Sequence, residues 1–315
     1  MKKSARNRII IWSIVSVVLT VVLVLGILNV NKLGTISLNP INISEITNVN
    51  VDEFTTGEAE IDKDTVKSLY IEWVSGDVNV VYGESDKILL TEESSSTSED
   101  DKMCWNVDDN GKLRVYSSKK SKTFIGLFND DVSKTLTVTV PKDMKFDDFD
   151  ISSASADVNV EFVNANKVII GTASGDIEVR GINSKNVDIS NVSGKSEVFC
   201  QQVDTIEMEA VSGEIIVDGN YSELSTESIS GKSKISAEAD NVDINSESVS
   251  GEINISLIES ISGFTAEYES VSGSFECDFA GKNRDDKFIY GNGMAEIDVE
   301  TVSGNISVES YSATK

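Results

Sequence analysis

The chain has 315 residues, of which 39% are hydrophobic, and 53 acidic against 27 basic residues give it a formal net charge of −26. It contains no histidine, which excludes Ser-His-Asp and Cys-His catalysis and every histidine-ligated metal site. A body this acidic will not bind nucleic acid or an anionic bilayer through a general electrostatic field. Solubility and self-repulsion explain the charge best. Cation binding, including weak Ca²⁺ binding by carboxylates, is the alternative.

The N-terminal segment predicts a membrane anchor. Residues 1–8 carry four basic and no acidic side chains, and residues 9–28, IIIWSIVSVVLTVVLVLGIL, carry no charge. As a helix, the second segment would be about 30 Å long, the thickness of the hydrocarbon core of a bilayer. The charge asymmetry predicts a cytoplasmic tail (1–8) and an extracellular C-terminal domain. A cleaved signal peptide is the alternative, but the following NVNKLGTISLNP lacks an A-x-A-like cleavage site.

We therefore expect a single-pass protein of the cell membrane. Residues 29–64 are expected to form a tether with little buried surface. Residues 65–148 are expected to hold a first coil and capping hairpins, because WNVDDNGKLRV (105–115) predicts a hairpin with an Asn-Gly turn and KTLTVTVP (134–141) alternates as a strand. The three cysteines, Cys104, Cys200 and Cys277, are odd in number and far apart, so we expect free and mostly buried thiols.

The tripeptide V-S-G, or a close variant, recurs along the rest of the chain. Its glycines are Gly76, Gly175, Gly194, Gly213, Gly231, Gly251, Gly273 and Gly304, and a degenerate copy, ASAD, places Ala156 in the same series. From Ala156 to Gly251 these corners follow one another at a nearly constant spacing, and the last two steps, to Gly273 and then to Gly304, are longer. A period of about 20 residues with a fixed turn is typical of a solenoid.

The residues around each glycine predict two strands per repeat. With the glycine as position 0, apolar residues recur at +2 and +4, such as Ile253 and Ile255, and at −7 and −5, such as Val187 and Ile189. A spacing of two indicates strands with one buried face. We also expect the apolar residue at −2 to turn inward at a bulge, and Ser-Gly to form a type II turn. The predicted fold is all-β: a parallel, β-helix-like β-solenoid over residues 149–315 with antiparallel capping strands.

The eight glycines are expected to be structural and not a ligand array. The residue after the glycine changes sign along the repeats, from Asp176 to Lys195 to Glu214, which a repeated binding residue should not do. Outward carboxylates such as Asp176, Glu178 and Glu252 could in principle supply the acid pair of a polysaccharide hydrolase. A solvated face is the simpler interpretation. We expect no catalytic residues, no cofactor and no metal site.

Four features together resemble a known bacterial family: the N-terminal anchor, the entry segment LTVTVPKDMKFDDFDISSASADVNV, the stacked V-S-G turns and the ending GNGMAEIDVETVSGNISV. This is the "putative adhesin" group of β-strand-repeat domains of unknown function, common in Gram-positive cell envelopes. The resemblance covers roughly residues 65–308 and implies a β-solenoid on the cell surface. It carries no catalytic residues across.

The sequence favours a non-enzymatic, membrane-anchored surface protein that binds or scaffolds cell-wall components, other envelope proteins or a host surface. An accessory role in the cell-envelope stress response is the alternative, and it rests on the resemblance alone. A β-helix polysaccharide hydrolase or lyase is a third, weaker hypothesis.

Overall fold

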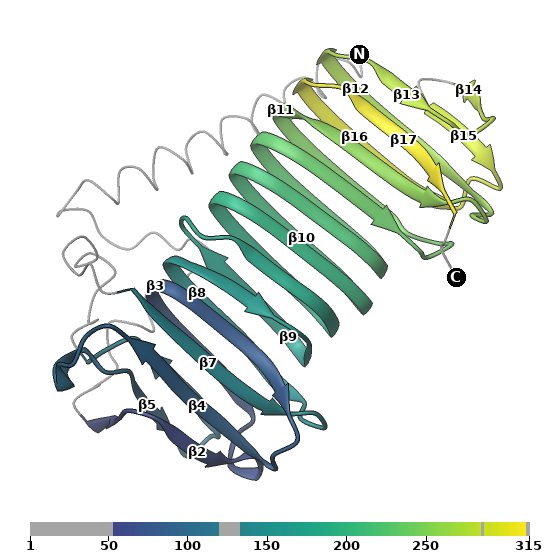
Figure 1. Cartoon of the computed structure of the whole chain (residues 1–315). Helices are drawn as coiled ribbons and strands as arrows, with labels where there is room; N and C mark the ends of the chain where they lie inside the picture. Colours follow the sequence, from purple (N-terminus) through teal and green to yellow (C-terminus); the bar gives the residue numbers. More distant parts are fainter. Residues whose placement is uncertain (1–52, 120–132, 285–286, 313–315) are drawn as a thin grey trace. The chain divides into compact units, whose positions relative to one another are not determined.

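The computed structural model describes residues 53–119, 133–284 and 287–312, all of which belong to one compact unit (Figure 1). Most of these residues lie in strands, so the all-β prediction is confirmed for them. The predicted tail and anchor and most of the predicted tether, residues 1–52, lie outside the described residues. Within the described ranges, no helix has the length and hydrophobicity that a membrane span requires.

Among the residues that the structure describes, seventeen strands form one continuous sheet. The first nine are β1 (Thr55–Thr56), β2 (Ala59–Asp62), β3 (Ser68–Gly83), β4 (Lys87–Ser94), β5 (Cys104–Val107), β6 (Lys112–Tyr116), β7 (Lys134–Pro141), β8 (Phe146–Val160) and β9 (Val163–Thr172). The others are β10 (Ile177–Ala237), β11 (Asp243–Ile258), β12 (Gly263–Ser272), β13 (Phe275–Cys277), β14 (Lys282–Arg284), β15 (Lys287–Gly291), β16 (Ala295–Ser303) and β17 (Ile306–Tyr311). Two short 3₁₀ turns, Lys63–Thr65 and Glu99–Asp101, lie near the start.

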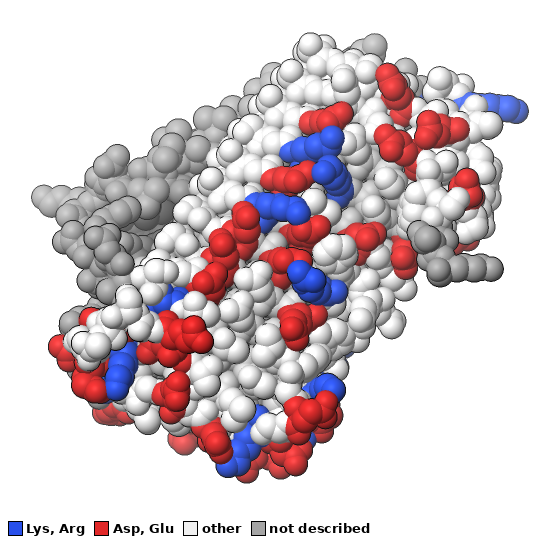
Figure 2. Space-filling model, in the orientation of Figure 1, with Lys and Arg blue, Asp and Glu red and all other residues white. Residues whose placement is uncertain are grey.

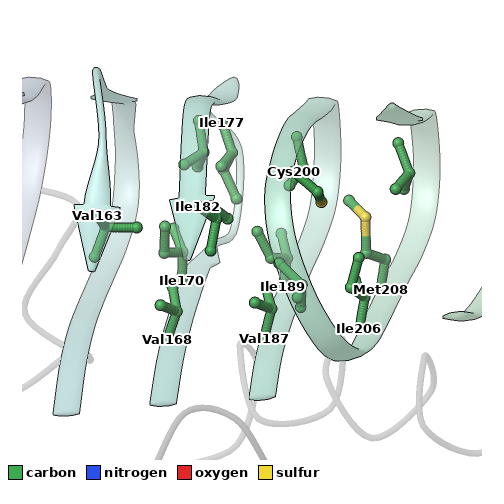
Figure 3. Packing of buried hydrophobic residues seen from close by; sticks show 14 of the residues in the cluster. Val163, Val168, Ile170, Ile177, Ile182, Val187, Ile189, Cys200, Ile206 and Met208 are labelled. Atoms are coloured by element: carbon green, nitrogen blue, oxygen red, sulfur yellow. The ribbon is translucent and has the colours of Figure 1, made fainter. Parts of the chain in front are cut away.

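The middle of the chain winds into parallel coils, each named below by its corner residue at position 0. Ile170 of β9 pairs in register with Ile151 of β8 and with Ile189 of β10, so the offset from one coil to the next is the same on both sides. Between β10 and β11 the offset is longer by one position, with Gly231 opposite Gly251. In Figure 3, equivalent side chains such as Val168, Val187 and Ile206 lie side by side in successive coils and form a row along the stack. The interior is therefore built from columns of like residues, each coil covered by its neighbours.

Two local predictions about the corner are wrong. Position −2 is not in the core: Val192, Val211 and Val249 are only half-buried. At most corners position −3 is buried instead, because the alternation from −7 and −5 continues unbroken into the corner. The inside of the corner holds short polar side chains that bond the backbone there: Ser153 accepts a hydrogen bond from the Ala156 amide at 2.7 Å.

The type II turn is also not what requires glycine. Four of the eight corner glycines, Gly175, Gly251, Gly273 and Gly304, have no positive φ, and β10 continues through three corners without interruption. The cause is close stacking of the backbone. A Cβ built on Gly251 would lie 2.0 Å from the carbonyl oxygen of Gly231, and one on Gly304 would lie 1.7 Å from that of Gly251. No other residue fits at that distance.

The N-terminal cap places strands out of chain order. β6 and β7 together form a coil on the outer side of β3, with Val115 opposite Ile71 and Leu136 opposite Val78. Antiparallel strands extend this coil outward. β5 pairs with β6 and β1 with β5, while β4 pairs with β7 and β2 with β4. The predicted Asn-Gly hairpin is confirmed as β5–β6. Part of the segment predicted as a tether, β1 and β2, belongs to this cap, where Ile61 is buried.

The coils at the other end also depart from chain order. β16 and β17, which form the Gly304 coil, lie between β11 and the β12–β13 coil of Gly273. The order in space is therefore Gly251, Gly304, Gly273. Antiparallel β15 and β14 close one half of this end. Ring contacts around Phe264, which lies 5.1 Å from Phe279 and 5.9 Å from Phe288 between centroids, cover the last layer of the core.

Candidate functional site

The coils offer two outer faces, one on each side of the corner. The paired face consists of the outward residues at +1 and +3, and the acidic face of those at −8, −6 and −4. Strand alternation dictates both, because residues between two inward positions must point outward. The two faces differ in how their charges are compensated.

Ion pairs within and between coils compensate part of the negative charge of the paired face. Lys232 lies 2.7 Å from Glu252, Lys234 lies 2.6 Å from Glu214, and Arg180 lies 2.8 Å from Glu178. Lys195 and Glu197 form a further pair. Figure 2 shows a band of alternating acidic and basic side chains across the coils on one face of the molecule. The hydrogen bond from Lys232 holds the pKa of the Glu252 carboxyl below its usual range.

The aspartates at +1 are tied to the backbone of the next coil. Oδ1 of Asp157 accepts a hydrogen bond from the Asp176 amide at 2.9 Å, and Oδ1 of Asp176 accepts one from the Lys195 amide at 2.8 Å. Asn305 does the same for the Ser274 amide at 3.1 Å. These contacts support a structural role for position +1. The carboxylates weighed for hydrolysis, Asp176, Glu178 and Glu252, all have such partners, and Glu252 lies four corners from the other two.

The acidic face carries a row of glutamates at position −4. We call this row the acidic ladder; in spatial order it is Glu209, Glu227, Glu247, Glu300 and Glu269. Glu227 pairs in register with Glu247, Glu247 with Glu300, and Glu300 with Glu269. Parallel neighbours lie about 4.8 Å apart, so each carboxylate has a like charge beside it. Among the described residues, no Lys or Arg forms an ion pair with Glu209, Glu227 or Glu247.

The electrostatics of the ladder differ from those of the paired face. Although Glu209 is an exposed residue, partial desolvation against the sheet, followed by the charges of Glu227, Asp188 and Glu207, raises its pKa from 4.5 to about 7. The same causes raise the pKa of Glu247, with Glu227 and Asp298 as its neighbours. Desolvation and Glu207 raise the pKa of Asp188. A positive charge placed beside Glu209 would favour the ionised form of its carboxyl.

A buried ion pair fixes the cap and was missed by sequence reasoning. Lys134, at the corner position of the β6–β7 coil, lies 2.9 Å from Glu92, and the two side chains are 6% and 7% exposed. Nζ of Lys134 also donates to the Ser117 carbonyl at 2.7 Å, while Glu92 accepts from the Met103 amide at 3.0 Å. Nothing in KTLTVTVP marks its first lysine as buried, so no sequence signal would have found the pair.

The three cysteines are free, as predicted, with Cys104 and Cys200 buried and Cys277 partly buried. Burial raises the pKa of the Cys104 thiol to about 11 and that of Cys200 to about 12. With such pKa values both thiols stay protonated at neutral pH, and a protonated thiol is a poor nucleophile. In the part of the chain that the structure describes, no three Cys, Asp or Glu side chains are arranged to hold a metal ion.

The family model that matches is Toastrack DUF4097, over residues 66–309. The chain belongs to the Toastrack DUF4097 family. This confirms the resemblance found in the sequence at the level of a β-rich family of unknown function. None of the curated proteins matches the sequence.

Similar solved structures carry related descriptions. A "putative lipid binding protein" from Parabacteroides distasonis is 17% identical, with a TM-score of 0.48, covering 82% of this chain and 96% of that one. A "putative adhesin" from Bacteroides fragilis is 12% identical, with a TM-score of 0.43 and coverages of 81% and 97%. A "putative cell adhesion protein" from Clostridium sporogenes is 15% identical, with a TM-score of 0.26 and coverages of 82% and 100%. Likenesses this distant say nothing about function.

Proposed function

We propose that this protein is a non-enzymatic, membrane-anchored surface protein whose acidic face binds an extended, positively charged partner in the cell envelope. The observation that carries the proposal is the acidic ladder. Glu209 and Glu227 are exposed, Glu247 is half-buried, and the paired face by contrast has its own counter-ions. An amine-bearing polymer or a basic protein segment relieves the repulsion along the row while it binds. Residues 9–28 keep the domain at the membrane.

The proposal assigns no catalysis. On the paired face, Asp176 accepts a hydrogen bond from a backbone amide, Glu178 pairs with Arg180, and Glu252 pairs with Lys232. The ladder carboxylates are equivalent neighbours in one column. An inverting or retaining hydrolase needs two carboxylates with different tasks on either side of a bond. Release of reducing sugars from cell-wall polysaccharide by the purified protein would contradict this part.

Binding is tested with the full chain in detergent. Retention on purified cell wall, membrane fractions and polylysine beads is measured at rising salt. The test variant is Glu209→Gln/Glu227→Gln/Glu247→Gln. The control is Glu58→Gln/Glu93→Gln/Asp109→Asn, three exposed acids in the cap for which no ion pair is seen among the described residues. Both variants change the net charge by the same amount.

We expect at least one fraction to retain the unaltered protein, with retention falling as salt is added. The ladder variant should bind about tenfold more weakly than the control variant. Equal losses in both variants would mean that only net charge matters, and no retention of the unaltered protein would leave the acidic face without a role.

A further inference from the structure

The Gly304 coil (β16–β17) is inserted between two coils that are neighbours in the sequence. On one side Ile297 and Ile306 pair with Ile244 and Ile253 of β11. On the other side the same two residues pair with Ala266 of β12 and Phe275 of β13. Its inward side chains, Ile297, Val299, Ile306 and Val308, are at most 1% exposed. The inserted coil thus fills a slot whose two walls are β11 and β12–β13.

The two walls can also pair with each other. Both are aligned to the inserted coil at the same corner, since Ser250 and Ser272 each lie opposite Ser303. Removing the coil would therefore bring the Gly251 and Gly273 corners into register. The chain length permits this, because the segment from Gly251 to Gly273 is two positions longer than the one that joins the adjacent coils of Gly231 and Gly251. In the present structure this segment spans the distance of two coils, from the Gly251 coil past the Gly304 coil to the Gly273 coil. It is therefore long enough to join the Gly251 and Gly273 coils if they become direct neighbours.

The slot selects its occupant by shape. A Cβ on Gly304 would lie 1.7 Å from the Gly251 carbonyl oxygen, and a Cβ on Gly273 would lie 1.9 Å from that of Gly304. The occupant must therefore bring a glycine corner, with β-branched residues two and four positions beyond it. A second copy of this chain carries such a segment in its own β16–β17.

The connection to the inserted coil can open. β15 and β16 are joined by Asn292–Met294, and Gly291 and Gly293 on either side of Asn292 have φ values of 57° and 70°. Glycine takes these values and extended ones at similar cost. If this loop became extended, β16–β17 could leave the slot of its own chain and enter the equivalent slot of a second copy. There it would form the same strand pairs, with β11 and β12–β13 of that copy. Exchange of identical elements in this way is a low-cost route to assembly.

We propose that β16–β17 is an exchangeable coil and that the slot between β11 and β12–β13 accepts the same coil from a second copy of the chain. The proposal goes beyond the binding function above and does not depend on it. Copies held on one membrane meet at high local concentration, which favours exchange between chains over return to the same chain.

Disulfides across the slot can test this directly. Asn254 of β11 and Ser307 of β17 are in register on the outer surface, with a hydrogen bond of 2.7 Å from Ser307 Oγ to Asn254 Oδ1. Neighbouring parallel strands place the two Cα atoms within the range of a disulfide. Asn254 and Glu276 each pair with Ser307 from opposite sides, so they lie two coils apart, about 10 Å, beyond that range.

The full chain is used in detergent, in a Cys277→Ser background. Two single variants, Asn254→Cys and Ser307→Cys, carry different affinity tags and are mixed, incubated and oxidised. We expect a covalent dimer that contains both tags. The matched control mixes Ser236→Cys with Ser256→Cys, which are also in register but belong to coils that cannot separate without unwinding the stack. That mixture should give no mixed dimer.

Two double variants check the starting arrangement. Asn254→Cys/Ser307→Cys should form its disulfide within one chain, and this also shows that the substituted protein folds. Asn254→Cys/Glu276→Cys should not. The proposal is overturned if the mixed single variants give no dimer while the first double variant closes. It is equally overturned if the Ser236 and Ser256 mixture gives as much dimer, or if the second double variant closes in place of the first.

Discussion

At the residue scale, the corner glycines are selected by distance between coils. The recurring V-S-G looks like a turn motif, and turn motifs are usually explained by a positive φ. At Gly251 there is no positive φ, yet a Cβ would meet the Gly231 carbonyl oxygen at 2.0 Å. The carbonyl belongs to the backbone and cannot rotate away. The glycine column is therefore what allows neighbouring coils to stack at strand spacing around the corner.

A Gly→Ala substitution usually combines two costs, backbone strain at a positive φ and a steric clash of the new Cβ. At Gly251 only the clash is present. Gly251→Ala adds no strain from φ, so its whole cost comes from pushing two coils apart. We expect a loss of about 3 kcal/mol in the free energy of unfolding, measured by urea denaturation followed by circular dichroism. Ser250→Ala, one residue earlier and exposed, is the control and should change the stability by less than about 0.5 kcal/mol. Equal effects at the two positions would show that close stacking is not the constraint.

At the scale of the strand, the acidic ladder makes stability depend on pH in an unusual direction. The pKa of Glu209 rises from 4.5 to about 7 in the folded protein, and those of Glu247 and Asp188 also rise. Between the unfolded and folded pKa values the folded state binds more protons than the unfolded state. The stability that Glu209 contributes is therefore full below about pH 4.5 and is lost as the pH rises through about 7, and Glu247 and Asp188 act in the same direction.

We expect the melting temperature to increase when the pH falls from 7.5 to 5. The change is followed by circular dichroism at constant ionic strength. The variant Glu209→Gln/Glu227→Gln/Glu247→Gln should show a flatter profile, because its amides do not titrate. The cap variant Glu58→Gln/Glu93→Gln/Asp109→Asn should keep the slope. A melting temperature that falls over this range in the unaltered protein would contradict the assignment.

Sequence reasoning succeeds for the strands and fails where the partner of a strand comes from a distant part of the chain. The repeat period and the inward positions at −7, −5, +2 and +4 follow from alternation, and the register of Ile170 and Ile189 confirms them. Position −3 was missed because Ser153 and Asn191 are polar, and only their bonds to corner backbone explain their burial. The place of the Gly304 coil could not be predicted, because Gly273 and Gly304 carry the same corner and either one fits beside Gly251.

At the scale of the whole unit, each coil is covered only by its neighbours, so stability should be local. A solenoid behaves approximately as a row of units with nearest-neighbour coupling. Val308 of the Gly304 coil and Val160 of the Ala156 coil occupy the same position, +4, and are at most 1% exposed. They form a matched pair near opposite ends of the stack.

Val308→Ala and Val160→Ala should each cost about 2 kcal/mol, because each removes buried methyl groups from a packed column. The two variants should differ in which strands show faster amide hydrogen exchange. For Val308→Ala we expect faster exchange in β11–β13 and β16–β17 and unchanged exchange in β8 and β9, and for Val160→Ala the reverse. Mass spectrometry of peptic peptides measures both in one experiment. If either substitution accelerates exchange equally from β3 to β17, the coils unfold as one cooperative unit. Exchange of β16–β17 between copies would then require global unfolding, so this measurement also tests whether the inserted coil can leave its slot while the rest of the stack stays folded.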